Sequence, residues 1–192
     1  MRSEKSSRAS GEAGTTLVEV LIATVIMATG ILTMSQMFLT STMTNRGARN
    51  DTFATVLAEQ KIEQLRALAW GFDVQGLPVS DFTSDISVEP MTTDGGTGLQ
   101  PSPASTLQTN TNGYVDHVSA TGQIVGNGAV APGIAAYTRR WSVEPLPTNP
   151  NNTLIIQVVV IPNRMQGQGA AATVGRLPGE ARMITVKTRK AQ

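Results

Sequence analysis

The strongest pattern in the chain is a long apolar run near its N-terminus, at residues 15–39. The run reads TTLVEVLIATVIMATGILTMSQMFL and carries one charged side chain, Glu19. At about 1.5 Å per residue, a helix of this length reaches roughly 37 Å, enough to cross a bilayer core of about 30 Å. A helix that is apolar on nearly all sides must lie in lipid or among other helices. The pattern therefore predicts a transmembrane segment over residues 15–40.

The helical pattern continues beyond this segment but becomes amphipathic over residues 41–71. Apolar residues recur there at helical spacing, at Ala54, Leu57, Ala58, Ile62, Leu65, Leu68 and Ala69. Polar residues are expected to cover the other side, at Glu59, Gln60, Lys61, Glu63 and Arg66. An amphipathic helix needs a partner for its apolar face, so this part is expected to pack on a sheet.

One helix is predicted from about Thr15 to Trp70, because the chain has no proline between Thr15 and Leu77 and Gly71 is a reasonable stop signal. Gly30 and the residues around Gly47 are candidate bends, since glycine destabilises a helix interior by about 1 kcal/mol. Periodicity leaves a second interpretation open, in which the membrane anchor ends near residue 45 and a separate helix follows.

The rest of the chain, residues 72–192, has the pattern of a small β domain. Alternation or β-branched runs predict strands near residues 135–146, 153–162 and 182–188, the first two joined as an antiparallel hairpin by the turn PTNPNN. Residues 90–136 are rich in Gly, Ser, Thr, Asn and Pro and predict a long variable loop, with a weak hairpin near 116–125. The expected fold class is α+β, a long N-terminal helix packed on a small antiparallel sheet.

Charge is unevenly distributed, although the formal net charge is only +1. Residues 67–138 hold 6 acidic groups and no Lys or Arg, whereas residues 139–192 hold 8 basic and 2 acidic groups. We expect these two blocks, −6 and +6, to meet within a subunit or between subunits. Before the apolar run stand Arg2, Lys5 and Arg8, which favour a cytoplasmic N-terminus with the remaining chain outside.

Residues for catalysis or cofactor binding are scarce. The chain has no cysteine, no phosphate-binding GxxxxGK[ST] motif and no GxSxG motif, and its one histidine, His117, is expected to be a solvated loop residue. Four loop acids, Asp81, Asp85, Glu89 and Asp94, are either calcium ligands or a solvated face. The basic C-terminus lacks aromatic residues on which bases would stack, so nucleic-acid binding is not expected. No enzyme activity, cofactor or metal is expected.

Three interpretations of the apolar segment compete. A secretory signal peptide would have a shorter core followed by a small-residue cleavage site, which is missing here. A plain signal anchor fits the length but gives Glu19 no role. In the third, the stretch GTTLVEVLIA, Gly14 to Ala23, resembles the class III signal of type IV pilins and type II secretion pseudopilins. The order of helix, variable loop and terminal sheet is similar to the pilin plan, with some likeness to minor pilins of the PilV type.

This resemblance implies specific roles for three residues. A prepilin peptidase would cut between Gly14 and Thr15, releasing residues 1–14 as a leader, and Thr15 would then be N-methylated. Family members usually have Phe or Met at this first mature position, and this chain has Thr15. The hallmark glutamate five residues after the cut is Glu19. Its carboxylate would pair with the Thr15 amine of its own chain or of a neighbour, since a charge in apolar surroundings needs a partner.

The function implied by the resemblance is a non-enzymatic structural subunit, a minor pilin or pseudopilin of a type IV pilus or a type II secretion-like filament. Its expected partners are other pilin helices, the prepilin peptidase and an inner-membrane assembly platform. Its expected location is the inner membrane, crossed once, and then the pilus or pseudopilus. The alternative is a membrane-anchored or filament-tip binding module, for adhesion or DNA uptake, on the same scaffold. An anchored enzyme is a third, remote alternative.

Overall fold

The computed structural model describes residues 16–165 and 177–190, and it divides the chain into two units. The first unit extends to Asn45 and the second begins at Arg46. Helix α1, Leu17–Ala67, contributes residues to both units. It includes Gly30 and Gly47, so neither of the candidate bends interrupts the helix. The predicted single helix is therefore confirmed, and the alternative of two separate helices is wrong.

The second unit contains a five-stranded antiparallel sheet in the order β4-β3-β5-β6-β7. Its strands are β3 (Val115–Ser119), β4 (Ile124–Gly126), β5 (Ala135–Pro145), β6 (Thr153–Pro162) and β7 (Ala181–Thr188). The predicted hairpin is β5–β6, with Trp141 opposite Val158, and the weaker one is β3–β4. A short 3-10 helix, η1 (Asn163–Met165), follows β6.

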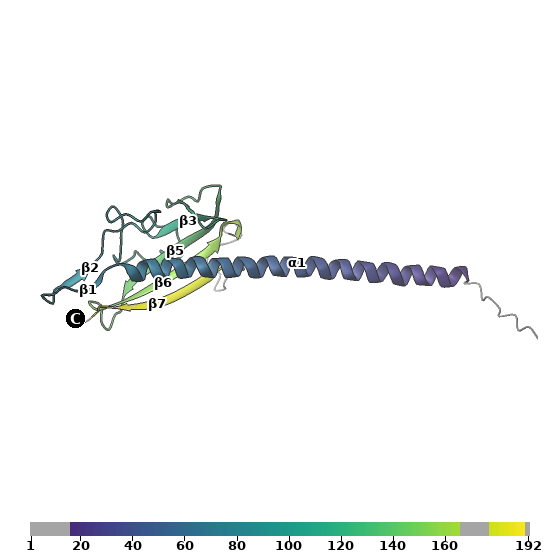
Figure 1. Cartoon of the computed structure of the whole chain (residues 1–192), viewed down its shortest axis with the longest axis horizontal. Helices are drawn as coiled ribbons and strands as arrows, with labels where there is room; N and C mark the ends of the chain where they lie inside the picture. The colour runs from purple at the N-terminus through teal and green to yellow at the C-terminus, as the bar shows by residue number, and fades with distance from the viewer. Residues whose placement is uncertain (1–15, 166–176, 191–192) are drawn as a thin grey trace, which may run out of the picture. The chain divides into compact units, whose positions relative to one another are not determined.

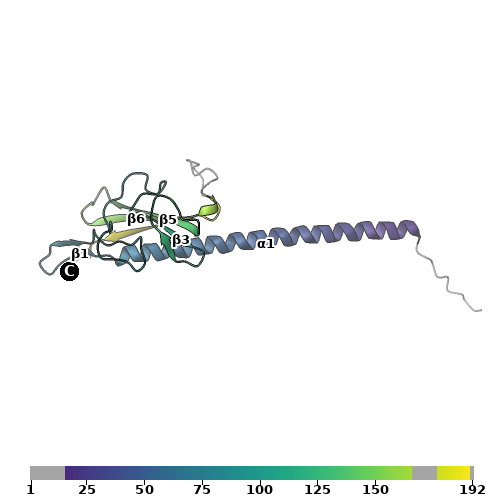
Figure 2. The same cartoon turned by 90° about the horizontal axis from the view of Figure 1, so that it is seen from above.

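The second part of α1 lies along one face of this sheet (Figures 1 and 2). Antiparallel pairing places cross-strand partners on the same face, so alternate residues of β5 and β6 point toward the helix. Trp141 and Val158 lie in the same buried cluster as Ala58 and Leu65 of α1. The core is thus made between one helical stripe and one sheet face, which is the predicted α+β fold in a pilin-like arrangement.

The opposite face of the sheet is also buried near β3 and β5, because the chain before β3 folds back over it. Arg140 donates hydrogen bonds there to the backbone carbonyls of Leu107 and Gln108 and to the side chain of Asn110. At the edge strand β7 nothing in the described chain covers this face, and Ile184 is 67% exposed.

The C-terminal end of α1 is fixed by a lysine from β7. Helix ends leave backbone carbonyls without partners, and Lys187 donates to those of Leu65, Arg66 and Leu68. The helix therefore ends at Ala67, before the predicted stop near Trp70. Ala69, predicted on the apolar stripe, lies beyond the helix and is exposed.

A two-stranded sheet follows the helix, formed by β1 (Trp70–Phe72) and β2 (Pro78–Ser80). Arg189 holds it to the end of the chain. The guanidinium lies 3.7 Å from the centre of the Trp70 ring and donates to the carbonyls of Gly71 and Val79. These two strands were not predicted from the sequence.

Candidate functional site

Glu19, the predicted assembly residue, lies in the first turn of α1. Thr16 precedes the helix, and its Oγ1 accepts a hydrogen bond of 3.3 Å from the backbone N–H of Glu19. Thr16 and Glu19 have the spacing of a capping box, and a carboxylate in the first turn interacts favourably with the helix dipole. Glu19 thus helps to stabilise the start of the helix, a role that was not predicted from the sequence.

The Glu19 carboxylate is exposed, and among residues 16–165 and 177–190 it has no hydrogen-bond or ion-pair partner. Gly14 and Thr15, the predicted cleavage pair, lie outside the described residues. Cleavage, methylation and pairing with an amine at Thr15 therefore stay predictions.

The part of α1 that follows Glu19 exposes large apolar side chains on every side. Leu17 is 81% exposed and Met37 is 69% exposed. One 18-residue window of α1 has a mean hydropathy of 2.2 and 0% of it is buried, so the described residues contain one helix long and apolar enough to cross a membrane. Such a surface requires lipid or other apolar helices as its surroundings.

Hydroxyl side chains in this part are bonded within the helix itself. Thr24 donates to the carbonyl of Leu21, Thr33 to that of Thr29, and Ser35 to that of Ile31. Polar groups in the bilayer core must be satisfied internally, because no water is available there. These hydroxyls therefore add little to the free-energy cost of inserting the helix into a membrane.

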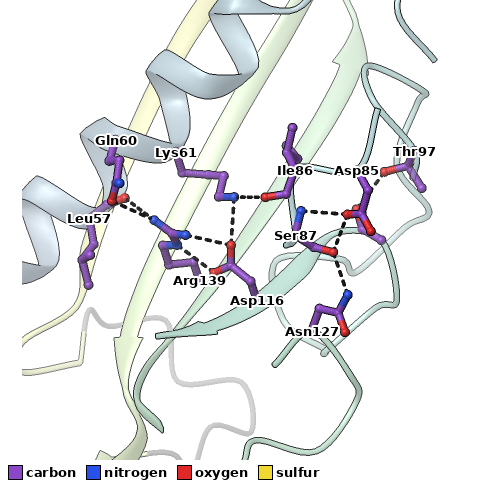
Figure 3. A network of polar contacts seen from close by, with 11 residues as sticks. Leu57, Gln60, Lys61, Asp85, Ile86, Ser87, Thr97, Asp116, Asn127 and Arg139 are labelled. Atoms are coloured by element: carbon purple, nitrogen blue, oxygen red, sulfur yellow. Dashed lines mark hydrogen bonds and ion pairs between the residues drawn. The ribbon is translucent and has the colours of Figure 1, made fainter. Parts of the chain in front are cut away.

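A second charged group on α1 has a very different environment. Lys61 and Asp116 both have 0% exposed side chains, and Lys61 Nζ lies 2.8 Å from Asp116 Oδ2. Asp116 also accepts two hydrogen bonds from Arg139, at 2.7 Å and 2.8 Å. Figure 3 shows this charge cluster of Lys61, Asp116 and Arg139 between α1, β3 and β5.

Neighbouring groups complete the hydrogen bonding of the charge cluster. Lys61 donates to the backbone carbonyl of Ile86, and Arg139 donates to the side chain of Gln60 (Figure 3). Lys61 Nζ also lies 4.6 Å from the centre of the Trp141 ring, a cation–π distance. Two positive groups share one carboxylate, so the cluster has a net charge of +1 in the buried core.

Burial lowers the pKa of Lys61 to about 8, and the attraction of Asp116 only partly opposes this effect. Arg139 lowers the Lys61 pKa further by like-charge repulsion, while Asp85 raises it. A perturbed lysine is a candidate for chemistry. Here the amine is buried, bonded to Asp116 and Ile86 and close to the Trp141 ring, so the cluster fixes α1 on the sheet.

Two sequence interpretations are wrong at this point. Lys61 was expected on the solvated side of the helix, but it is buried because it falls three residues after Ala58 and four before Leu65, inside the apolar stripe. His117 was expected to be a solvated loop residue, but it lies in β3 at 0% exposure. Its Nδ1 is bonded to Thr138 Oγ1 and its Nε2 to the Gly128 carbonyl.

Two of the four loop acids accept hydrogen bonds from the backbone of their own loop. Asp81 Oδ1 accepts from the N–H of Thr83 and of Ser84, and Asp85 Oδ1 accepts from the N–H of Ser87. The described residues contain no group of three or more His, Asp or Glu side chains that could hold a metal ion.

Among the described residues, one ion pair joins the acidic block to the basic block, and it is formed by Asp116 and Arg139. The other ion pairs between described residues join Lys61 with Asp116, Arg66 with Glu63, and Arg182 with Glu180. Contact between the blocks of different subunits remains a prediction.

No protein-family model, curated protein or solved structure matches this chain.

Proposed function

We propose that this chain is a non-enzymatic structural subunit, a minor pilin or pseudopilin, which is processed by a prepilin peptidase and assembled from the membrane through its N-terminal helix. The observation that carries the proposal is a contrast on α1: an apolar helix with exposed side chains has in its first turn a glutamate that pairs with no described residue. The motif around Gly14 supports the same conclusion.

The energetic argument concerns the Glu19 carboxylate. A charge at the centre of a bilayer costs about 2.5–3.5 kcal/mol on insertion scales, and less near its edge. The helix dipole and the Thr16 cap offset part of this cost but leave the carboxylate without a counter-charge. In the proposed assembly, the amine created at Thr15 of the same or a neighbouring subunit supplies it. A pair between subunits would also fix the axial register of the packed helices.

The processing step is tested by co-expression with a prepilin peptidase and mass spectrometry of the intact product. We expect the loss of residues 1–14, and Gly14→Val should block it. A wild-type chain that keeps its first 14 residues in the presence of an active peptidase would rule the proposal out, and it would leave a plain membrane anchor as the better explanation.

The pairing role of Glu19 is separated from its capping role by two substitutions. Glu19→Gln keeps a residue that can close the capping box but removes the charge. Thr16→Ala removes the cap hydroxyl but keeps the carboxylate. If pairing matters, Glu19→Gln should insert into membranes and be cleaved but fail to co-assemble into filaments, whereas Thr16→Ala should assemble. Assembly of Glu19→Gln at wild-type level, measured by its recovery in sheared filaments, would contradict the pairing role.

A further inference from the structure

A basic cavity lies at the start of the second unit, where α1 first approaches the sheet. It has a volume of about 540 Å³. Its walls include Arg46 and Arg49 from α1, Arg164 from η1, and the side chains of Phe53 and Tyr137. The two aromatic rings pack together with centroids 5.4 Å apart and form an apolar wall. The cavity thus combines three guanidinium groups with a nonpolar surface.

The three arginines are available for a ligand. None of them has an ion-pair or hydrogen-bond partner through its side chain among residues 16–165 and 177–190. The acidic residue nearest in sequence to Arg46 and Arg49 is Asp51, and its charge acts on Tyr137, as that of Arg164 does. One negative charge beside three positive charges leaves a local charge of +2. Guanidinium groups bind phosphate oxygens in bidentate geometry, so this set matches a phosphate group.

The position of the cavity along α1 indicates where such a phosphate would come from. Arg46 follows Leu39, the last residue of the predicted membrane run, by only seven residues in the sequence. The headgroup layer adds roughly 5–7 Å on each side of the hydrocarbon core. Long arginine side chains can extend back toward that layer while their stems stay on apolar surface. Anionic headgroups attract basic residues at this depth.

We propose that this cavity binds the phosphate group of an anionic phospholipid, with Arg46, Arg49 and Arg164 holding the phosphate and the Phe53–Tyr137 wall contacting the glycerol backbone. The source of the phosphate as a lipid rests on the proposed membrane insertion of α1. The phosphate chemistry itself rests only on the second unit. The lipid would hold the second unit, called the outer domain below, close to the membrane surface before the subunit leaves the bilayer.

The test uses the full chain in a non-ionic detergent and counts bound lipids by native mass spectrometry. Phosphatidylglycerol and phosphatidylcholine are compared, because both carry a phosphate and only the first has a net negative charge. The double variant Arg46→Gln/Arg49→Gln and the single variant Arg164→Gln probe the cavity. Arg66→Gln/Lys190→Gln removes the same charge from exposed positions outside the cavity and serves as the matched control.

We expect phosphatidylglycerol to bind more tightly than phosphatidylcholine. The cavity variants should weaken it about tenfold, the loss expected for one charged hydrogen bond, while the control keeps wild-type binding. Inorganic phosphate is added in competition. If it does not displace the lipid, the ligand is the whole headgroup; if it does, the cavity recognises phosphate from either source.

Equal binding of the two lipids, or an equal loss in the cavity and control variants, overturns the inference. These outcomes are independent of the processing test. A chain that binds phosphatidylglycerol but is never cleaved loses only the proposed function, and a chain that is cleaved but shows no lipid preference loses only the cavity assignment.

Discussion

Glu19 and Lys61 are charged residues of one α-helix in opposite situations. Lys61 is fully buried and its counter-charge, Asp116, is supplied by the same chain 2.8 Å away. Glu19 is exposed, and the described chain supplies it with none. A charge in apolar surroundings is tolerable only when it is paired. The second part of α1 is therefore completed by its own domain, whereas the first part needs lipid or other helices around it.

The largest effect is expected when Lys61 loses its counter-charge. Asp116→Asn leaves two buried positive groups without a carboxylate, and breaking a buried pair in this way costs about 3–5 kcal/mol. Thermal unfolding of the full chain in detergent, followed by tryptophan fluorescence, measures the change. Asp94→Asn, in an exposed part of the loop, should leave the transition unchanged.

A second substitution distinguishes the loss of the counter-charge from a general failure of Asp116→Asn to fold. Lys61→Met added to Asp116→Asn removes one of the two orphaned charges, so the double variant should be more stable than Asp116→Asn alone. A double variant no more stable than the single one would contradict the pairing argument.

A similar contrast is expected for apolar residues of the two parts of α1. Leu65 is buried in the core, and Leu65→Ala should cost about 2–5 kcal/mol through lost contacts and the cavity left behind. Met37 is 69% exposed, and Met37→Ala should leave the unfolding of the outer domain unchanged. Chemical denaturation of both variants in the same detergent measures the difference. Equal destabilisation would show that the two parts fold as one unit.

The third effect is a pH dependence produced by Lys61. Its pKa is about 8 in the folded chain and roughly 10.4 in an unfolded one, so between these values the unfolded state binds more protons. The free energy of unfolding should therefore rise with pH from about 8 toward 10, by on the order of 2 kcal/mol. Below pH 8 the burial cost of the charged amine is fully present.

Lys61→Met should flatten this rise, as measured by denaturant unfolding at several pH values between 7 and 10. Burial also lowers the pKa of Lys187, which contributes a smaller slope of the same sign. Burial raises the pKa of Tyr114 and Tyr137, so these groups oppose the Lys187 effect as the pH approaches 10. A slope in Lys61→Met equal to that of the wild type would contradict the assignment to Lys61.

The smallest stability effect is expected at Glu19. Glu19→Ala should change the unfolding free energy of the outer domain by less than about 0.5 kcal/mol, as is usual for exposed positions. In the proposed assembly the same substitution abolishes filament formation. A variant with a destabilised outer domain would mean that its assembly defect reports misfolding, so thermal unfolding must accompany every assembly assay.

Strong local periodicity explains which elements could be predicted from the sequence. The alternation around Trp141 and the β-branched run ending at Pro162 gave β5 and β6 within a few residues. The strands β1 and β2 have three residues each, too few for a pattern, and Arg189 holds them from the far end of the chain. Contacts between such distant segments leave no local signal.

The charge cluster was only partly predictable. Lys61 does stand at helical spacing between Ala58 and Leu65, so a strict reading of the stripe would have placed it inside. Its polar character favoured the opposite interpretation. Its partner Asp116 and the second cation Arg139 come from two strands whose pairing register no sequence pattern specifies. His117 was missed for a related reason, because the Gly128 carbonyl that covers it comes from a loop.

The hydroxyl side chains of the apolar helix have a consequence for how easily it changes surroundings. Between Leu17 and Thr40, each threonine and serine hydroxyl donates to a carbonyl of its own helix. Moving such a segment from lipid into a bundle of protein helices breaks none of these bonds and requires no new ones. The transfer then exchanges one largely apolar contact surface for another, so its free-energy cost is concentrated in two side chains that need partners at the destination, the Gln36 amide and the Glu19 carboxylate.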